Sequence, residues 1–188
     1  MALTGKVAPY KAGFGPFPPE IYHAPFPCHC ASLAEVKKAM QHLFKADIEP
    51  SRVAAIVFEP VQGEGGFNVI QAEAVTWLRE LCDEHGIVLI ADEVQTGFGR
   101  TGKMFAMEHF APVVPDLMTM AKGLTSAYVQ LGAVGMRPQI ARVFQEKAFP
   151  GGLTYNSHPL ACAAALATLE VIDDERRRHR RRQAGRGQ

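Results

Sequence analysis

The chain has 188 residues, a formal net charge of +1 and 47% apolar residues, which is the composition of a globular protein and not of a disordered one. No run of roughly eighteen apolar residues occurs, so no membrane span is expected. The first residues, MALTGKVAPYKAG, lack the apolar core of a signal peptide, which favours a cytoplasmic protein.

The first third of the chain passes from irregular to regular structure. Residues 1–31 are rich in proline, glycine and aromatic side chains, and this composition predicts an irregular segment. Ser32 and Glu35 then form the pattern of a capping box, followed by apolar residues at helical spacing in LAEVKKAMQHLFK. The stretch VAAIVFEP (53–60) predicts a buried strand that Pro60 ends.

A second helix and strand complete a parallel unit. AEAVTWLRELCDEHG (72–86) predicts an amphipathic helix with Val75, Leu78 and Cys82 on one face and glycine as its C-cap. IVLIADE (87–93) predicts a second buried strand. A strand, a helix and a strand within about forty residues indicate a parallel sheet.

The remainder of the chain adds short strands and two helices. Strands are predicted at 116–122 and 131–136, a helix follows in RPQIARVFQEK, and an Ala- and Leu-rich helix is predicted at 158–172. The alternation of strands and helices predicts an α/β protein, a mostly parallel sheet flanked by helices.

Charge is concentrated at the end of the sequence. Residues 176–188, RRRHRRRQAGRGQ, hold seven arginines and no acid, and the remaining 13 basic and 19 acidic side chains give a net charge of −6. An arginine run can bind nucleic acid, but no aromatic or helical periodicity accompanies it, so a disordered, solvated tail is favoured. The spacing of Cys28 and Cys30, with no second pair, predicts no metal site.

Polar residues end three of the predicted strands. Glu59 ends the first, Asp92 and Glu93 end the second with Gln95 just beyond, and Lys122 ends the third. Ligands of open parallel sheets bind beyond the carboxyl ends of the strands. A lysine amine there can act as a nucleophile and form a Schiff base with an aldehyde cofactor.

Four stretches resemble one family. FEPVQGEGG, LIADEVQTGFGRTG, PDLMTMAKGL and GLTYNSHPLACAAALA are similar, in order, to motifs of the class III pyridoxal-phosphate aminotransferases, the 4-aminobutyrate aminotransferase group. The resemblance implies part of the large domain of a fold-type I transferase that depends on pyridoxal 5'-phosphate (PLP). It also implies a homodimer that uses an amino-acid donor and a 2-oxo acid acceptor.

The resemblance also implies roles for individual residues. Lys122 would form the Schiff base with PLP and move a proton as general base and acid. Asp92 would meet the protonated ring nitrogen, Val94 would lie against the ring face, and Gln95 would bind the phenolic oxygen. Thr154 would reach the cofactor phosphate of the neighbouring subunit.

Two glutamates match positions that the family uses toward the substrate. Glu64, in the QGEGG loop, matches a glutamate that pairs with a distant arginine, and Glu59 matches a carboxylate near the reacting carbon. For both residues a purely structural role, as a loop carboxylate that accepts backbone N–H bonds, remains an alternative.

The expected chain is a partial PLP-binding large domain over 1–175, irregular over 1–31 and α/β over 32–175, with an arginine-rich tail over 176–188. It looks truncated at both ends compared with the family. The expected function is transamination of an ω-amino acid, with a donor like 4-aminobutyrate, to a 2-oxo acid. The alternatives are the ω-amino acid or taurine–pyruvate branch and a non-catalytic dimerisation fragment.

Overall fold

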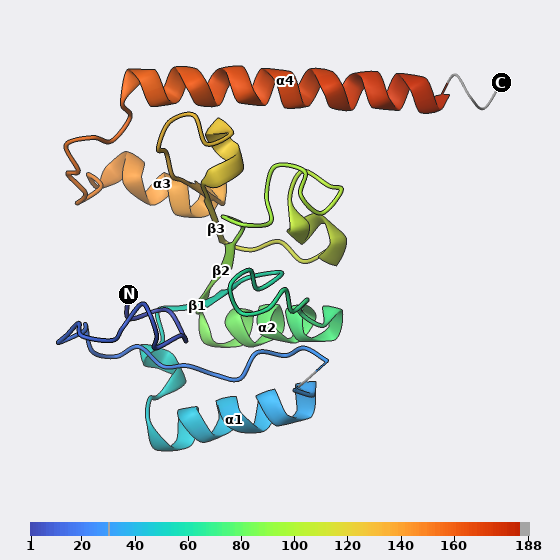
Figure 1. The fold of residues 1–188 in the computed structure, drawn as a ribbon. Coiled ribbons are helices and arrows are strands. Elements are labelled where there is room, and N and C mark those ends of the chain that lie inside the picture. The colour runs from blue at the N-terminus through green and yellow to red at the C-terminus, as the bar shows by residue number, and fades with distance from the viewer. Residues whose placement is uncertain (30, 185–188) are drawn as a thin grey trace. The chain divides into compact units, whose positions relative to one another are not determined.

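The computed structural model describes residues 1–29 and 31–184, with side chains for 1–29 and 31–176 (Figure 1). The chain divides into two compact units. One comprises Met1–Ile56 and Val61–Ile87, and the other comprises Val57–Pro60 and Val88–Gln188. The prediction that 1–175 form one domain stays a prediction.

Two amphipathic helices form the core of the first unit, α1 (Leu33–Ala46) and α2 (Ala72–His85). The ring of Phe44 meets His85 edge-on, with 6.0 Å between ring centroids, so the two helices pack against each other. The predicted C-cap of α2 is confirmed, because Gly86 has φ 69°, a left-handed conformation that glycine adopts without strain. The buried residues of these helices are Val36, Met40, Ala74, Val75, Leu78 and Cys82.

The predicted capping box at the start of α1 is also confirmed. The Glu35 N–H donates to Ser32 Oγ at 3.3 Å, and Glu35 Oε2 accepts from the Ser32 N–H at 2.8 Å and from its hydroxyl at 2.7 Å. These bonds satisfy N–H groups that the first turn of a helix leaves without intrahelical partners. The Ser32 hydroxyl, and then its backbone N–H, lower the pKa of Glu35 below its usual range.

Glu35→Gln is expected to make the stability of the chain less dependent on acid pH. A carboxylate whose pKa is lower in the folded state stabilises the fold above its unfolded pKa and loses that contribution as pH falls through the folded pKa. The difference between wild type and Glu35→Gln, measured by urea unfolding, should therefore be present at pH 7 and shrink below about pH 4.3, the usual glutamate value. Glu73→Gln, in the uncapped first turn of α2, serves as control. A difference that does not change with pH would contradict the prediction.

A four-stranded sheet runs in the order β1-β2-β3-β4. β2 and β3 are parallel, with Asp92 opposite Thr119, whereas β3 and β4 are antiparallel. The predicted fold class, α/β with a mostly parallel sheet flanked by helices, is confirmed. The strands are β1 (Ala55–Phe58), β2 (Val88–Asp92), β3 (Leu117–Met120) and β4 (Ala133–Met136).

Several strands are shorter than the apolar runs that predicted them. β1 begins late because η1 (Pro50–Arg52) is a 3-10 turn whose cap N–H, from Val53, donates back to the Pro50 carbonyl at 3.1 Å. β3 ends at Met120 because Lys122 has φ 43°, which an extended strand cannot accommodate. Lys122 therefore follows the strand and begins η3 (Lys122–Thr125).

Two further helices belong to the second unit, α3 (Pro138–Glu146) and α4 (Pro159–Ala184) (Figure 1). The sequence predicted the end of the last helix near residue 172 and a disordered tail from 176, but α4 continues to Ala184. Arginine is a good helix former, and extending an existing helix requires no new nucleus. The last four residues of the predicted tail, 185–188, lie outside the described residues.

None of the helices in the described part of the chain is long and apolar enough to cross a membrane.

Candidate active site

The carboxyl ends of β2 and β3 lie at the same edge of the sheet, because the two strands are parallel and Asp92 is paired with Thr119. Beyond this edge the Lys122 amine donates a hydrogen bond to Gln95 Oε1. Three of the residues singled out in the sequence, Asp92, Gln95 and Lys122, are thus supplied by the ends of adjacent strands. A primary amine, an amide oxygen and a carboxylate are thereby gathered at the place where open α/β sheets bind ligands.

Asp92 is half-buried at the last position of β2. Its Oδ1 accepts from the Val94 N–H at 3.0 Å, an Asx-type contact that turns the chain sharply after the strand. Within the described part of the chain Oδ2 has no hydrogen-bond partner, so it is left to accept from solvent or from a ligand. Val94, predicted to lie against a cofactor ring, is half-buried in the same turn.

The loop that carries the lysine is held in an unusual backbone conformation. Lys122, Ser126 and Ala127 all have positive φ, at 43°, 50° and 64°. Such conformations persist in non-glycine residues when the surroundings determine them. Here Leu124 and Thr125 are buried, and α4 packs against η3. The lysine therefore projects from an anchored turn although its own side chain is exposed.

A hollow of about 560 Å³ lies beside Lys122. This volume is within the usual range of small-molecule binding sites. The lining of the hollow includes polar groups of Tyr155, Asn156 and Ser157, none of which was predicted from the sequence as a site residue. Thr154, the predicted phosphate ligand, lies outside the set of described lining residues. That set is Ala121, Lys122, Thr125, Ala127, Val129, Gln130, Leu131, Gly132, Tyr155, Asn156 and Ser157.

Gly123→Ala is expected to destabilise the second unit. A Cβ at this position would lie 2.8 Å from Cβ of Phe98, so the added methyl must push apart η3 and the turn that follows β2. Overpacking of this kind costs about 1–3 kcal/mol, which urea unfolding would measure. Gly132→Ala is the matched control, because its Cβ would meet Met120 O at 3.6 Å, an ordinary contact. Equal stability of the two variants would contradict the prediction.

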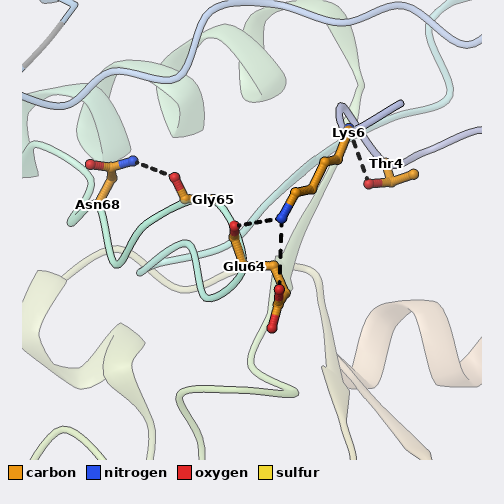
Figure 2. A network of polar contacts seen from close by, with 5 residues as sticks. All are labelled: Thr4, Lys6, Glu64, Gly65 and Asn68. Atoms are coloured by element: carbon orange, nitrogen blue, oxygen red, sulfur yellow. Dashed lines mark hydrogen bonds and ion pairs between the residues drawn. The ribbon is translucent and has the colours of Figure 1, made fainter. Parts of the chain in front are cut away.

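Glu64 lies in the first unit, in the loop between β1 and α2. Its side chain is 80% exposed, and its Oε2 is 3.8 Å from Lys6 Nζ, which also donates to the Glu64 carbonyl at 3.4 Å (Figure 2). The loop itself is tied by Asn68, whose Nδ2 donates to Gly65 O at 3.1 Å. Glu64 therefore has a cationic partner, a lysine of the N-terminal segment, where the resemblance implied an arginine.

Glu59 is half-buried directly after β1, in the second unit. It has an interaction partner in the structure, so it is not a free carboxylate. Its predicted role toward a substrate, like that of Glu64, stays a prediction.

The comparisons with known proteins identify the family. Residues 1–186 match the family model of the class III aminotransferases. The chain belongs to the class III aminotransferase family. The match continues beyond residue 175, where the sequence analysis ended the resemblance, into the arginine-rich segment.

Relatives in this family are similar over nearly the whole chain. It is 49% identical over 179 residues to a 4-aminobutyrate aminotransferase of Escherichia coli strain K12, covering 93% of this chain and 41% of the relative. It is 48% identical over 180 residues to a 5-aminovalerate aminotransferase of Pseudomonas putida, covering 94% and 41%. The chain thus spans about 41% of the length of the curated relatives that it matches.

Solved structures of transaminases share the fold. An (S)-enantioselective ω-transaminase of Thermomicrobium roseum matches with a TM-score of 0.84 and 38% identity, over 93% of this chain and 41% of that one. The taurine:2-oxoglutarate aminotransferase of Bifidobacterium kashiwanohense, solved with PLP and glutamate, matches with a TM-score of 0.67 and 41% identity, over 72% and 30%. At these identities the class III aminotransferase fold extends to the present chain.

Proposed function

We propose that this chain supplies two cofactor-binding residues, Lys122 and Asp92, of a PLP-dependent aminotransferase. The enzyme transfers the amino group of an ω-amino acid to a 2-oxo acid. The observation that carries the proposal is the hydrogen bond from the Lys122 amine to Gln95 at the carboxyl edge of β2 and β3. Membership of the class III aminotransferase family supports it.

The residues at this edge fit the chemistry of PLP. When bound, PLP supplies an aldehyde that reacts with amines and a ring that accepts electrons. Lys122 is the amine that would hold the aldehyde, and Asp92 Oδ2 is an acceptor available for the protonated ring nitrogen. Gln95 would bind the phenolic oxygen, and Val94 would lie against the ring. The neighbouring hollow of about 560 Å³ lies within the size range of small-molecule sites, and Lys122, Tyr155, Asn156 and Ser157 supply polar groups to its lining.

In the proposed reaction each residue has a defined task. Lys122 Nζ takes a proton from the amino-bearing carbon of the donor and gives it back later, as general base and then general acid. The Asp92 carboxylate keeps the ring nitrogen protonated by accepting its hydrogen bond. We also propose that Thr154 binds the phosphate of the cofactor in the partner subunit. Glu59 and Glu64 are proposed to contact the substrate.

An ω-amino acid is the donor that the relatives favour. The two relatives at 48–49% identity are named for 4-aminobutyrate and 5-aminovalerate, whose amino groups are remote from the carboxylate. The taurine:2-oxoglutarate aminotransferase among the solved structures supports taurine as an alternative donor, but it does not support pyruvate as the acceptor. Assays with 4-aminobutyrate, 5-aminovalerate and taurine, each against 2-oxoglutarate and pyruvate, separate these donors and acceptors.

Attachment of the cofactor is the first test. The purified chain is mixed with PLP and reduced with borohydride, which leaves a pyridoxyl group on the lysine that held the cofactor. The proposal expects a single modified peptide, the one that contains Lys122. Labelling scattered over surface lysines, or no labelling, would overturn the proposal for this chain and favour a non-catalytic dimerisation fragment.

A homodimer and a cytoplasmic location belong to the same proposal. The resemblance to the family supports the homodimer, because the active sites of that family form across two subunits. Sedimentation of the purified chain with and without PLP would test the dimer, and a monomer in both conditions would contradict it.

A further inference from the structure

Glu93 is a buried carboxylate beside the proposed site, and the proposed reaction does not use it. It lies between Asp92 and Val94, and its residue surface is 0% exposed. We propose that Glu93 is a positioning residue: it fixes the turn after β2 so that Gln95 meets the Lys122 amine and Asp92 faces the ring nitrogen. Only the expected effect of Glu93 on PLP binding rests on the proposed function. The expected effect on the Lys122 amine does not.

The Glu93 side chain joins two segments that are distant in sequence. Its Oε1 accepts from the Met107 N–H at 2.7 Å, and its Oε2 accepts from the Ala106 N–H at 3.0 Å and from the Thr96 hydroxyl. Ala106 is the first residue of η2 (Ala106–Phe110). Residues 94–105 therefore leave the sheet after Glu93 and return to the same carboxylate.

The Glu93 backbone continues this arrangement. Its N–H donates to Thr119 O of β3 at 3.0 Å, and its carbonyl accepts from the Gly97 N–H at 2.9 Å. Gly97 allows the tight turn, because a Cβ there would lie 2.9 Å from the Glu93 carbonyl oxygen. Glu93 therefore contacts β3, the turn that holds Gln95, and η2, and these contacts fix the backbone on both sides of Gln95.

The chemistry of the contacts requires a carboxylate. No cation pairs with Glu93 among the residues that the structure describes, so its two buried oxygens are satisfied by two backbone N–H groups and one hydroxyl. Both oxygens face a backbone N–H. Glutamine would always direct its own NH₂ at one of these donors, and aspartate is one methylene too short to reach both.

The enclosed turn also touches the lysine loop. Phe98 contacts Gly123, the residue after Lys122, and packs edge-on against Phe105 with 5.6 Å between ring centroids. A shift of the turn therefore moves Gln95 and disturbs the support of Lys122 together. The reactivity of the Lys122 amine should report this shift even when no cofactor is present.

The test compares Glu93→Gln with Glu108→Gln in the cofactor-free chain. Glu108 is the matched control, because its exposed Oε1 accepts from the Phe105 N–H at 2.9 Å, a bond that glutamine can keep. Acetylation by trace acetic anhydride, read by mass spectrometry, should be several-fold faster at Lys122 in Glu93→Gln and unchanged in Glu108→Gln. Lysines of the first unit, such as Lys37, provide the internal reference.

A second measurement concerns PLP. Absorbance titration should show about tenfold weaker binding and a shifted absorption maximum in Glu93→Gln, with the control like wild type. If Glu93→Gln does not fold, Thr96→Val removes one bond alone and should shift both readouts in the same direction, while Thr96→Ser, which keeps the hydroxyl, restores them.

The outcomes separate the two proposals. Unchanged Lys122 acetylation in a folded Glu93→Gln, or in Thr96→Val, would overturn the positioning role whatever PLP does. If wild type takes up no PLP but Lys122 acetylation changes as expected, the positioning role stands and the proposed function fails. Faster acetylation at every lysine would mean general unfolding of Glu93→Gln, and Thr96→Val then decides.

Discussion

Replacing Lys122 with alanine is expected to abolish the pyridoxyl label and to lower transamination by at least about 10²–10⁴-fold, the contribution of a general acid–base group. The reason is that no second amine is held at the carboxyl edge of β2 and β3 by a described contact like the one between Lys122 and Gln95. The label is read by peptide mapping after borohydride reduction, and the rate by product formation from 4-aminobutyrate.

Two further variants separate chemistry from folding. Lys122→Arg keeps the positive charge and can still donate to Gln95, but a guanidinium does not attach to an aldehyde, so the chain should fold and remain unlabelled. Lys103→Ala is the control, since Lys103 lies in the same unit and donates to the Glu108 carbonyl at 2.9 Å. Labelling at another lysine in Lys122→Arg, with activity retained, would contradict the assignment.

Much of the fold was predictable because local rules and packing agree. The capping box at Ser32 and Glu35 and the glycine after α2 signal helix ends through hydrogen-bond chemistry that lies within a few residues. The ends of the strands were less predictable. β3 stops two residues before Lys122 because the backbone turns left-handed there, and an apolar run carries no signal for such a change.

The end of α4 shows a different limit. The arginines from residue 176 indicate a solvated segment, but composition does not distinguish a solvated coil from a solvated helix that continues an existing one. The division of the chain into two units was also not predictable, because it depends on contacts between distant residues.

The site residues that lie at the ends of strands were predictable from the sequence. Asp92, Gln95 and Lys122 could be singled out because polar residues that end apolar strands meet at one edge of a parallel sheet. Tyr155, Asn156 and Ser157 lie in one of the stretches that resemble the family, but only the folded chain shows that they lie beside Lys122. Glu93 was visible as an acid at the end of an apolar strand, but its partners at Ala106 and Met107 follow from the return of a loop and not from spacing.

Asp92→Asn is the variant that isolates the charge at the ring nitrogen. Asparagine has nearly the same shape, and its Oδ1 can still accept from the Val94 N–H, so the turn after β2 should survive. The hydrogen bond to a charged partner is lost, and such bonds contribute about 1.5–3 kcal/mol. PLP affinity should therefore fall roughly 10- to 100-fold, which an absorbance titration would measure.

Asp116→Asn is the control variant, because Asp116 has structural contacts and no proposed role toward PLP. Asp116 lies just before β3, where its carboxylate accepts from the Leu89 N–H at 2.9 Å and lies 3.5 Å from Arg137. Loss of the Asp116 carboxylate should lower stability toward urea and leave PLP affinity close to that of wild type. Asp92→Asn should lower PLP affinity and leave stability toward urea close to that of wild type, since its effect requires the protonated ring nitrogen of PLP at the end of β2. If both variants lose stability and affinity in parallel, the carboxylate of Asp92 acts on the fold and not on the cofactor.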